Sequence, residues 1–478
     1  MSTKVMETTR RTTGTVGLVL ALLSAILAFQ LNASMLSPVL ATMERELNAT
    51  AVQIGVSQTA FFTAAALFSL VLPRWGDLIG RRKIMIGMLV VTALGSVVAA
   101  LSVNVYMLFV ARIIQGVSGP IVPMALIMLR AQMPDEKRYA FWMAVLTSVN
   151  GGIAGVDALA GGWLAANYGF RSVFWTMAVV AVLAIVFVRF GTLETRAEES
   201  QKMDWGGALA LVVSLGAILT AFNELGKLDQ ANFVLVGILL VIGVVAFFIF
   251  WRIESTIAHP LVTTTYMKQR RTWGLLLTTV LTMTGIFAIM NGLVPNLAQS
   301  PEFAGLGADT VSWFTLTPYA LAGLIMGPIA GKIAGKLGYL SVLRGGLVVT
   351  LLGIFFAMYV VTNTTPITLL IVSLWIGISY AGVCNIMLNG LGVVLSPKDN
   401  QGYLPGMNSG AFNIGAGLSF ALLFMVNTTV GAAQGEAAGY QAGMLTGAII
   451  IVLALVASFL IPSPARVEEE DKQAAAAA

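Results

Sequence analysis

The sequence predicts an all-α membrane protein that crosses the bilayer many times. Hydrophobic residues make up 58% of its 478 residues and charged residues only 10%, whereas soluble domains carry about 25% charged residues. The apolar residues are gathered in long runs, and short segments between the runs carry most of the charges. Runs of about 18 or more apolar residues predict membrane-spanning helices. A water-soluble globule is therefore excluded.

Fourteen runs are long and apolar enough to be spanning helices. The first follows Lys4, Arg10 and Arg11 and so imitates a signal peptide, but it continues to about residue 40 and many spans follow, so we interpret it as an uncleaved helix. In chain order, the predicted spans are residues 15–40, 51–72, 84–102, 106–130, 139–164, 173–192, 205–223, 232–252, 273–295, 309–331, 340–361, 366–395, 403–429 and 437–461.

The basic residues predict the orientation of these spans. An even number of spans places both termini on one side. Arg45, Arg171 and Lys227 then fall on the opposite side, Arg112 lies within a span, and the remaining Lys and Arg residues lie on the side of the termini. Cytoplasmic loops are enriched in Lys and Arg, so we expect cytoplasmic termini and a multi-pass protein of the plasma (inner) membrane. The net charge of +5 belongs to these loops and predicts no nucleic-acid partner.

Several kinds of chemistry are excluded by composition. A single Cys384 and a single His259 leave no disulfide, no cysteine-based metal site and no histidine cluster, so we expect no cofactor. Residues 327–332 have the wrong spacing for a phosphate-binding loop, and no nucleophile or paired-acid arrangement predicts an enzyme. Any active transport must therefore use an ion gradient.

A charged segment between the second and third spans carries the clearest motif. It reads Pro73-Arg74-Trp75-Gly76-Asp77-Leu78-Ile79-Gly80-Arg81-Arg82-Lys83 and resembles the loop between helices 2 and 3 of the major facilitator superfamily. Asp77, Gly80 and Arg81 match that motif, while Pro73 and Leu78 depart from it. The resemblance implies that Asp77 and Arg81 latch the inner ends of neighbouring helices. An ordinary charged loop is the alternative.

The fourth span contains a second motif, Arg112-Ile113-Ile114-Gln115-Gly116-Val117-Ser118-Gly119. Helical spacing places Arg112, Gln115, Gly116 and Gly119 on one face, where glycines let another helix approach closely. A guanidinium at this depth must find an acceptor. The segment resembles the Arg-x-x-Gln-Gly-x-Gly motif of the superfamily, which implies a role for Arg112 in proton coupling. Alternatively, Arg112 only pins its helix to a backbone carbonyl.

Three further segments extend the resemblance along the chain: Gly169-Phe170-Arg171-Ser172-Val173-Phe174-Trp175, Asp204-Trp205-Gly206-Gly207 and His259-Pro260-Leu261. With the span count, they make the chain similar to the fourteen-helix drug:proton antiporter family, which includes quaternary-ammonium and tetracycline exporters. The resemblance implies a major facilitator fold with two six-helix halves, residues 1–192 and 273–461, and two inserted helices with their linker in 193–272. The repeat of the loop motif at 331–338 supports these halves, and the acidic tail 462–478 is expected to be disordered.

The chain departs from that family at two places. The acidic residue expected in helix 1 is replaced by Phe29, and the Gly-Pro-x-x-Gly-Gly motif of helix 5 reads Asp157-Ala158-Leu159-Ala160-Gly161-Gly162. Asp157 is thus a carboxylate deep in the membrane, at about the depth of Arg112. A buried acid without a partner favours its neutral form and could carry a proton, whereas pairing with Arg112 would favour the charged form. A permanent structural ion pair, or an Asp facing a small water pocket, is the alternative.

Other polar residues at membrane depth are candidates for binding a substrate. Intramembrane polar groups usually face the protein interior, but each amide could equally form a hydrogen bond between helices. The candidates are Gln30, Asn32, Gln115, Asn150, Asn291, Tyr380, Asn385 and Asn389, with Phe61, Phe62, Trp313 and Trp375 as aromatic surfaces for a planar substrate.

These features predict a secondary active transporter of small organic molecules. The resemblance implies proton-coupled multidrug or metabolite export, with protons, the substrate and the bilayer as partners and a monomer as the working unit. The alternative is proton-coupled uptake, or facilitated passage, of a neutral or anionic metabolite, because the helix 1 acid is absent and Arg112 adds positive charge.

Overall fold

The computed structural model describes residues 14–133, 135–196, 204–225, 231–257, 264–396, 403–465 and 467, and in these ranges it is helical without strands. The first part of the chain forms α1 (Thr15–Ser34), η1 (Ser37–Val39), α2 (Leu40–Glu46), α3 (Ala51–Ile79), α4 (Arg81–Ala100), α5 (Val105–Gln115), η2 (Gly116–Ser118), α6 (Ile121–Gln132), α7 (Glu136–Tyr168) and α8 (Phe170–Gly191). We call α1 to α8 the N-terminal bundle.

The rest of the chain begins with a pair of helices, α9 (Trp205–Leu225) and α10 (Phe233–Thr256), and the short α11 (Thr264–Met267). The C-terminal bundle follows. It consists of α12 (Arg270–Ala288), η4 (Ile289–Leu293), α13 (Val294–Gln299), α14 (Ala308–Phe314), α15 (Leu316–Leu337), α16 (Tyr339–Thr362), α17 (Pro366–Ile376), η5 (Gly377–Cys384), α18 (Asn385–Val394), α19 (Tyr403–Gln434), α20 (Glu436–Ala457) and η6 (Ser458–Leu460).

Twelve helices in the described part of the chain are long and apolar enough to cross a membrane. Some of them join several elements, such as the span Thr15–Glu46, which contains α1, η1 and α2. Helices also occupy the two other predicted positions. α7 is 33 residues long and carries polar residues such as Asn150 and Asp157. α9 spans Trp205–Leu225, and its part Trp205–Ile218 is apolar.

Several helices extend beyond the predicted spans; α15, for example, continues to Leu337 although its span was predicted to end at residue 331. α3 continues to Ile79, although its span was predicted to end at residue 72, so most of the charged segment from Pro73 onward is helical. α7 begins at Glu136, before the predicted residue 139. Hydropathy marks where a helix leaves the membrane, but the backbone can stay helical beyond that point. The motif at 259–261 and the tail 468–478 lie outside the described residues.

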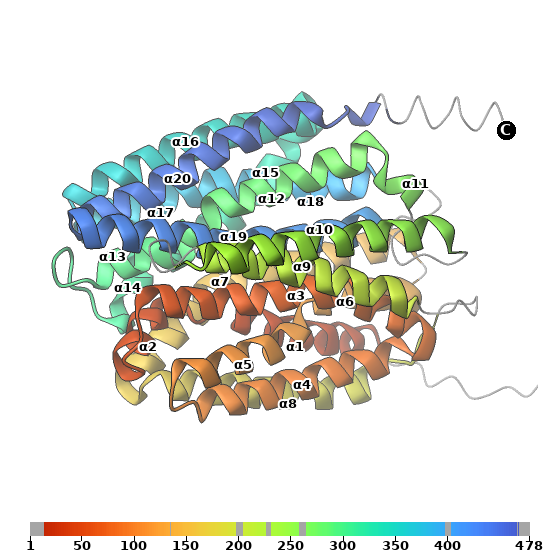
Figure 1. The fold of residues 1–478 in the computed structure, drawn as a ribbon. Helices are drawn as coiled ribbons and strands as arrows, with labels where there is room; N and C mark the ends of the chain where they lie inside the picture. Colours follow the sequence, from red (N-terminus) through yellow and green to blue (C-terminus); the bar gives the residue numbers. More distant parts are fainter. Residues whose placement is uncertain are drawn as a thin grey trace, which may run out of the picture.

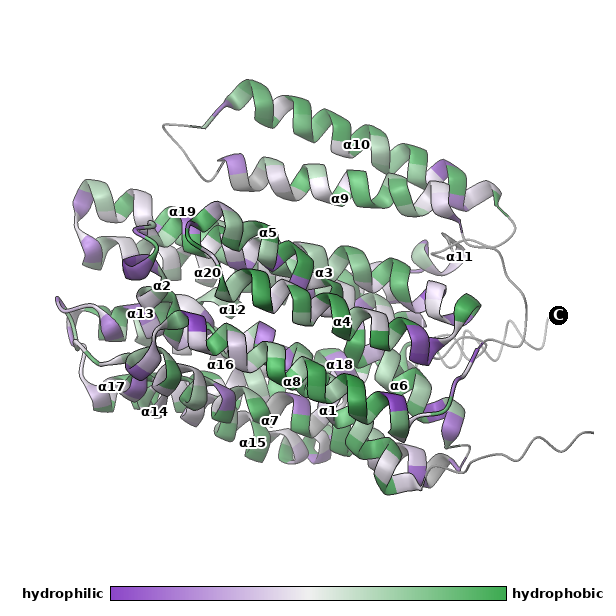
Figure 2. Cartoon of the chain, turned by 90° about the horizontal axis from the view of Figure 1, so that it is seen from below, coloured by the Kyte–Doolittle hydropathy of each residue, from purple (hydrophilic) through white to green (hydrophobic). Residues whose placement is uncertain are grey.

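The two bundles lie side by side with their helices roughly parallel, and the beginning of α1 and the end of α20 lie at the same end of the molecule (Figure 1). α9 and α10 form a hairpin at the margin (Figure 2), where α9 contacts both α3 and α19. The hairpin therefore covers one side of the junction between the bundles. Trp205 of α9 packs edge-on against Trp75 of α3, with ring centroids 5.7 Å apart.

Contacts between the bundles lie in three regions. α3 and α19 pack against each other over much of their length, and Thr59 Oγ1 donates a hydrogen bond of 3.1 Å to the Gly417 carbonyl. On the other side of the junction α7 packs against α15, and α6 also contacts α19. Further contacts gather at the end of the molecule away from the termini, which we call the distal end: α2 contacts α13, η1 contacts η4 and α14, and α7 contacts α14. At the distal end, Asn296 Nδ2 donates a hydrogen bond to the Glu44 carboxylate across the junction, at 3.3 Å.

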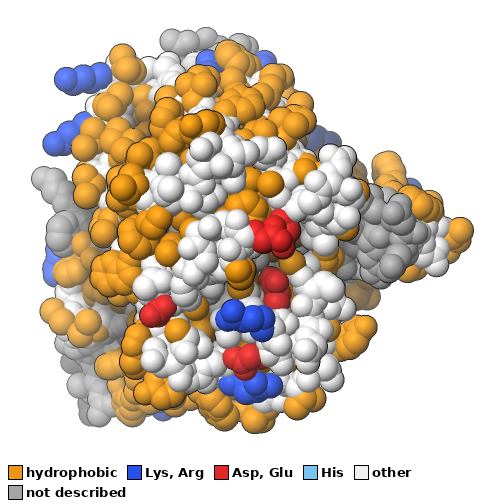
Figure 3. Space-filling model, turned by 90° about the vertical axis from the view of Figure 1, so that its left-hand side faces the viewer, with side chains coloured by type: hydrophobic (Ala, Val, Ile, Leu, Met, Phe, Trp, Pro, Cys, Tyr) orange, Lys and Arg blue, Asp and Glu red, His pale blue; other side chains and the backbone are white. Residues whose placement is uncertain are grey.

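The distal end carries few charged side chains. Figure 3 shows a mostly uncharged face with a small group of acidic and basic side chains. Arg171 pairs with Glu46 at 3.1 Å within this region.

Candidate functional site

Arg112 lies in the interior of the N-terminal bundle with its side chain fully buried. Its Nη1 donates to Gln115 Oε1 at 2.9 Å, and its Nη2 donates to Gln58 Oε1 at 3.0 Å and to the Asn32 carbonyl at 3.1 Å. The guanidinium also lies over the ring of Phe61, 4.2 Å from the ring centroid. Arg112 therefore ties together the helices α1, α3 and α5 through neutral acceptors.

The glycines that follow Arg112 bring its helix close to α3. A Cβ atom added to Gly116 would lie 2.4 Å from the Cβ of Ala64, and one added to Gly119 would lie 2.4 Å from the Ala65 carbonyl oxygen. Real Cβ atoms do not approach other atoms so closely, so any larger residue would push the helices apart. These glycines hold the fourth span at the distance that lets Arg112 reach Gln58.

Asp157 lies in α7, with 4% of its surface exposed. The Ser34 hydroxyl, in the last turn of α1, lies 2.6 Å from Asp157 Oδ2 and donates a hydrogen bond to it. Ser34 Oγ also lies 3.1 Å from the Gln30 carbonyl and accepts a hydrogen bond of 3.0 Å from Gln30 Nε2. The other carboxylate oxygen, Asp157 Oδ1, is buried without a hydrogen-bond partner among the described residues.

The structure does not pair Arg112 with Asp157. No ion pair joins them in the described part of the chain, and each contacts α1 instead, Arg112 at Asn32 and Asp157 at Ser34. Of the two states weighed from the sequence, this arrangement is the unpaired one.

The backbone on both sides of Asp157 binds the C-terminal bundle. Thr317 Oγ1 donates to the Gly155 carbonyl at 2.7 Å, and Ser312 Oγ donates to the Ala158 carbonyl at 3.2 Å. Further along α7, a Cβ atom on Gly162 would lie 2.0 Å from the Ala308 carbonyl oxygen. Asp157 therefore lies in the segment of α7 through which the two bundles touch.

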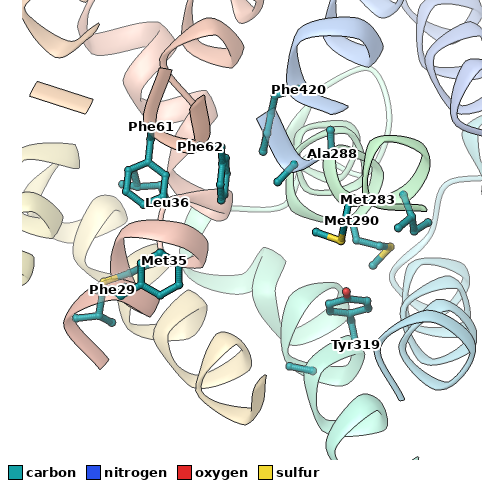
Figure 4. Packing of buried hydrophobic residues seen from close by; sticks show 14 of the residues in the cluster. Phe29, Met35, Leu36, Phe61, Phe62, Met283, Ala288, Met290, Tyr319 and Phe420 are labelled. Carbon is teal, nitrogen blue, oxygen red and sulfur yellow. The ribbon is translucent and has the colours of Figure 1, made fainter. Parts of the chain in front are cut away.

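Aromatic side chains from both bundles meet near the centre of the molecule. The ring of Phe62 lies edge-on to Phe287, at 5.2 Å between centroids, and nearly parallel to Phe420, at 6.3 Å. Phe62 also packs edge-on against Phe61, which stacks on Phe29 at 6.4 Å. Figure 4 shows Phe62 of the N-terminal bundle beside Phe420 of the C-terminal bundle, with Phe61 on the other side of Phe62. We call these five residues the aromatic cluster.

The predicted polar residues lie in several environments. Gln30, Asn32 and Gln115 belong to the two networks on α1, and Gln115 Nε2 also donates to Ser96 Oγ at 2.9 Å. Asn291 is buried in the π-helical turn η4, with Ser37 Oγ at 3.5 Å from its Oδ1. Asn150 Oδ1 is buried without a hydrogen-bond partner among the described residues.

The predicted residues of the twelfth span do not share one environment. Tyr380, in the π-helical turn η5, is buried, and its hydroxyl contacts Met283 Sδ at 2.7 Å. Asn389 Nδ2 donates to Asn385 Oδ1 at 2.8 Å, closer to the terminal end, where Asn389 is exposed. Of the aromatic candidates, Trp313 is 60% exposed and so lies away from the centre.

The charged segment 73–83, which covers the end of α3 and the start of α4, forms contacts within the N-terminal bundle. Arg81 Nε binds Asp77 Oδ1 at 2.7 Å. Gly80 between them has φ +123°, which a residue with a side chain rarely adopts. The next residue, Arg82, contacts the Thr192 carbonyl and Glu194. The segment therefore joins the ends of α3 and α4 to the chain that leaves α8.

Three polar residues that complete these networks were not predicted from the sequence: Ser34, Gln58 and Ser96. A signal was available for two of them, because Ser34 lies one helical turn after Gln30 and Gln58 is an amide inside a predicted span. Ser96 looks like any serine in an apolar helix. Among the described residues, no group of three His, Cys, Asp or Glu side chains could hold a metal ion.

Comparison with known proteins identifies the family to which the chain belongs. Residues 22–420 match the Major Facilitator Superfamily. The chain belongs to this superfamily. A major facilitator protein carries solutes across a membrane, so the chain is a multi-pass transporter and not an enzyme.

Individual relatives differ in what they carry. The chain is 55% identical over 453 residues to a uridine/deoxyuridine transporter of Lactococcus lactis, and the aligned region covers 94% of each chain. It is 24% identical over 322 residues to Multidrug resistance protein 3 of Bacillus subtilis, covering 66% of this chain and 59% of that protein. The comparisons thus support the metabolite alternative better than drug export.

Solved structures show the same fold. A mutant of the nucleoside transporter NupG is similar with a TM-score of 0.62 at 13% identity, covering 93% of this chain and 99% of that one. A peptide transporter of the POT family has a TM-score of 0.66 at 13% identity, covering 94% of this chain and 96% of that one.

Proposed function

We propose that the protein is a secondary active transporter that takes up uridine and closely similar pyrimidine nucleosides together with protons. The observation that carries this proposal is the 55% identity, across 94% of both chains, to a uridine/deoxyuridine transporter. Identity at that level over the whole length includes the spans that surround the centre of the molecule, where a solute must pass.

The side chains at the centre suit a neutral, planar solute with many hydroxyl groups. Uridine offers a flat base for stacking and hydrogen-bonding groups for amides. The aromatic cluster supplies ring faces from both bundles, and Gln30 of α1, Asn150 of α7 and Asn291 of η4 supply uncharged donors and acceptors. Bases stack favourably on aromatic side chains, so we assign the base to the cluster and the ribose hydroxyls to the amides.

Asp157 is the proposed proton site. Burial of a carboxylate with one oxygen unpartnered is costly in the charged form and much less so in the neutral form. The backbone beside it contacts the other bundle through Thr317 and Ser312. Loading and release of a proton at Asp157 would therefore act where the bundles meet. Arg112 is proposed to hold α1, α3 and α5 in register rather than to pair with Asp157 in this arrangement.

The proposed topology has fourteen crossings, with α7 and α9 added to the twelve apolar spans. We propose that the end bearing the termini is cytoplasmic, because the basic residues of the charged segment 73–83 lie there. In the arrangement described here the bundles then meet at the outer side. Asp77, Gly80 and Arg81 are proposed to form a cytoplasmic latch, and a single chain contains the whole path, so a monomer suffices.

Export in exchange for protons is the second candidate. It is favoured by the similarity to Multidrug resistance protein 3. The two candidates differ in the sign of the pH gradient that drives accumulation. In symport, protons and substrate cross the membrane in the same direction, whereas in exchange they cross in opposite directions.

Transport into proteoliposomes tests the proposal. Radiolabelled uridine should accumulate when the lumen is more alkaline than the medium, and excess deoxyuridine should compete while a quaternary ammonium compound should not. Accumulation of a quaternary ammonium compound under the opposite gradient, without uridine transport, would establish export instead. The Arg189→Lys protein, altered only at an exposed position of α8, serves as a control for reconstitution.

A further inference from the structure

We infer that Ser34 is a positioning residue that links the protonation state of Asp157 to helix α1. The inference rests on the proposed role of Asp157 as the proton site. It adds to that role the group, Ser34, through which protonation of Asp157 on α7 changes the hydrogen bonds of α1, the helix that carries Gln30.

The hydrogen bonds around Ser34 can be counted. A serine hydroxyl has one proton to donate and two lone pairs that accept. Ser34 Oγ has three polar neighbours: the Asp157 carboxyl oxygen at 2.6 Å, the Gln30 carbonyl at 3.1 Å and Gln30 Nε2 at 3.0 Å. The amide nitrogen can only donate and the carbonyl can only accept, so the single hydroxyl proton has two competing acceptors whenever Asp157 is ionised.

Protonation of Asp157 removes this competition. The acid proton on Oδ2 then donates to Ser34 Oγ, and the hydroxyl proton turns to the Gln30 carbonyl, while the amide of Gln30 still donates to Ser34. All three neighbours are satisfied without movement of a heavy atom. When the proton leaves, the hydroxyl proton must turn back to the carboxylate. The Gln30 carbonyl loses that bond and Asp157 Oδ1 still lacks a donor.

Asp157 forms no ion pair with any described residue, and Arg112, predicted at about the same depth, binds neutral acceptors instead. α1 and η1, which pack against α7, contain no titratable residue. The titratable or charged residues on the other described helices that pack against α7 are Arg130 of α6, Arg171 and Arg189 of α8, Asp309 of α14, and Tyr319, Lys332 and Lys336 of α15. Of these, Tyr319 is the residue placed near the centre of the molecule, and it stacks on Tyr380.

The two protonation states of Asp157 therefore differ in the hydrogen bonds that the last turn of α1 forms. The neutral acid completes the hydrogen bonds of the last turn of α1, which favours the arrangement described here. The ionised acid accepts the hydrogen bond of the Ser34 hydroxyl, and its Oδ1 still needs a donor. Gln30 lies one turn away on the same helix, so its amide is the group most directly affected, and Gln30 is also a proposed substrate contact.

Replacement of Ser34 gives a signed expectation. A hydroxyl that donates to a carboxylate forms a charge-assisted bond, which is about twice as strong as a bond between neutral groups. Ser34→Ala removes one charge-assisted bond from the ionised acid, and from the neutral acid it removes a neutral bond and the bond to the Gln30 carbonyl. Gln30 and Ser34 both lie inside α1, where a backbone N–H bonds the carbonyl four residues back, so loss of the hydroxyl costs that carbonyl little. The ionised acid therefore loses more stabilisation than the neutral acid. Asp157 should then keep its proton to higher pH, and the midpoint of the pH profile of uridine transport should move to higher pH by roughly one unit.

The experiment compares pH profiles of initial uridine uptake in proteoliposomes for the wild type, Ser34→Ala and Ser34→Thr. Threonine keeps the hydroxyl, so its midpoint should match the wild type. Ser69→Ala is the matched control, because Ser69 is also buried in a helix but donates only to the Ala65 carbonyl of its own turn. If the alanine protein does not fold, Ser34→Cys, with its weaker hydrogen bonds, should shift the midpoint in the same direction by less.

A Ser34→Ala midpoint equal to that of the wild type would overturn the inference, as would an equal shift in Ser69→Ala. Failure of the proposed function is visible separately, since the wild type would then not transport uridine at all. In that case the same variants are compared through the pH dependence of the distance between spin labels on α2 and α13. Ser34→Ala should shift the pH of the distance change, and an unchanged pH would again reject the role of Ser34.

Discussion

Arg112 and Asp157 both contact the last turn of α1 and do not contact each other. Arg112 Nη2 donates to the Asn32 carbonyl at 3.1 Å, and the Ser34 hydroxyl lies 2.6 Å from Asp157 Oδ2. Helix α1 thus carries the contacts of both buried groups, only two residues apart. A change in either group can reach the other through this helix without a direct ion pair.

Asp157→Asn should abolish the accumulation of uridine driven by a pH gradient while leaving exchange of uridine across the membrane intact. Asparagine keeps the shape of the side chain and can still bond to Ser34, but it cannot gain or lose a proton. Uptake should also lose its pH dependence. The measurement is gradient-driven uptake beside counterflow at equal pH on both sides. Continued accumulation against a gradient in the variant would show that another group carries the proton.

Arg112→Lys should reduce transport at least about tenfold, because an ammonium cannot reach Gln58, Gln115 and the Asn32 carbonyl together and each bond to a charged group contributes about 1.5–3 kcal/mol. The buried amide oxygens left without a donor add to this loss. Initial uptake rates, corrected for the amount of folded protein, provide the measurement. Arg189→Lys, on the exposed face of α8, is the control for a general effect of the substitution. Full activity of Arg112→Lys would mean that only the positive charge matters.

The sequence was sufficient to locate the long apolar helices, twelve of which are confirmed as spans among the described residues, and the buried charges Arg112 and Asp157, but not to choose the partners of these charges. Long apolar runs identify helices because each one must satisfy its own backbone in the membrane, and Arg112 and Asp157 stand out because charges at that depth are rare. Their partners depend on how each helix is rotated and packed. One serine, Ser34, among the many in apolar spans could not be selected without that packing.

The contacts at the junction between the bundles could not be predicted from the sequence either. The sequence identified Gly161-Gly162 as a remnant of a motif, but not that α7 approaches Ala308 at this point. The extension of α3 to Ile79 was missed because hydropathy reports the membrane boundary and not the end of the helix. These features arise from contacts between segments far apart in the chain.

Asp77→Asn should remove the charge that holds Arg81 at 2.7 Å within the N-terminal bundle. Such a partly exposed ion pair contributes only about 0.2–1 kcal/mol. Because the pair is formed while the bundles meet at the distal end, the proposed latch requires Asp77 to bind another helix end when the cytoplasmic side closes. Loss of that contact should shift the conformational population toward an open cytoplasmic side and lower turnover, with substrate affinity little changed. Distances between spin labels at Lys83 and Lys336, exposed residues of the two bundles, measure this shift. The sole cysteine, Cys384, is buried, which favours selective labelling. Glu302→Gln is the control, and an unchanged distance distribution in Asp77→Asn would remove the latch from the mechanism.

Gly162→Ala should prevent the bundles from meeting at the distal end. The added Cβ would lie 2.0 Å from the Ala308 carbonyl oxygen, which belongs to backbone and cannot rotate away. Gly87→Ala is a matched control, since the space around Gly87 is open within 4 Å. Labels at Arg45 and Glu302, exposed residues of the two bundles near the distal end, should move apart in Gly162→Ala and keep the wild-type distance in Gly87→Ala. Uridine transport should fall sharply in the first variant, because a carrier that cannot close on one side cannot complete its cycle. Wild-type distances and transport in Gly162→Ala would show that the close approach of α7 and α14 is not needed for closure.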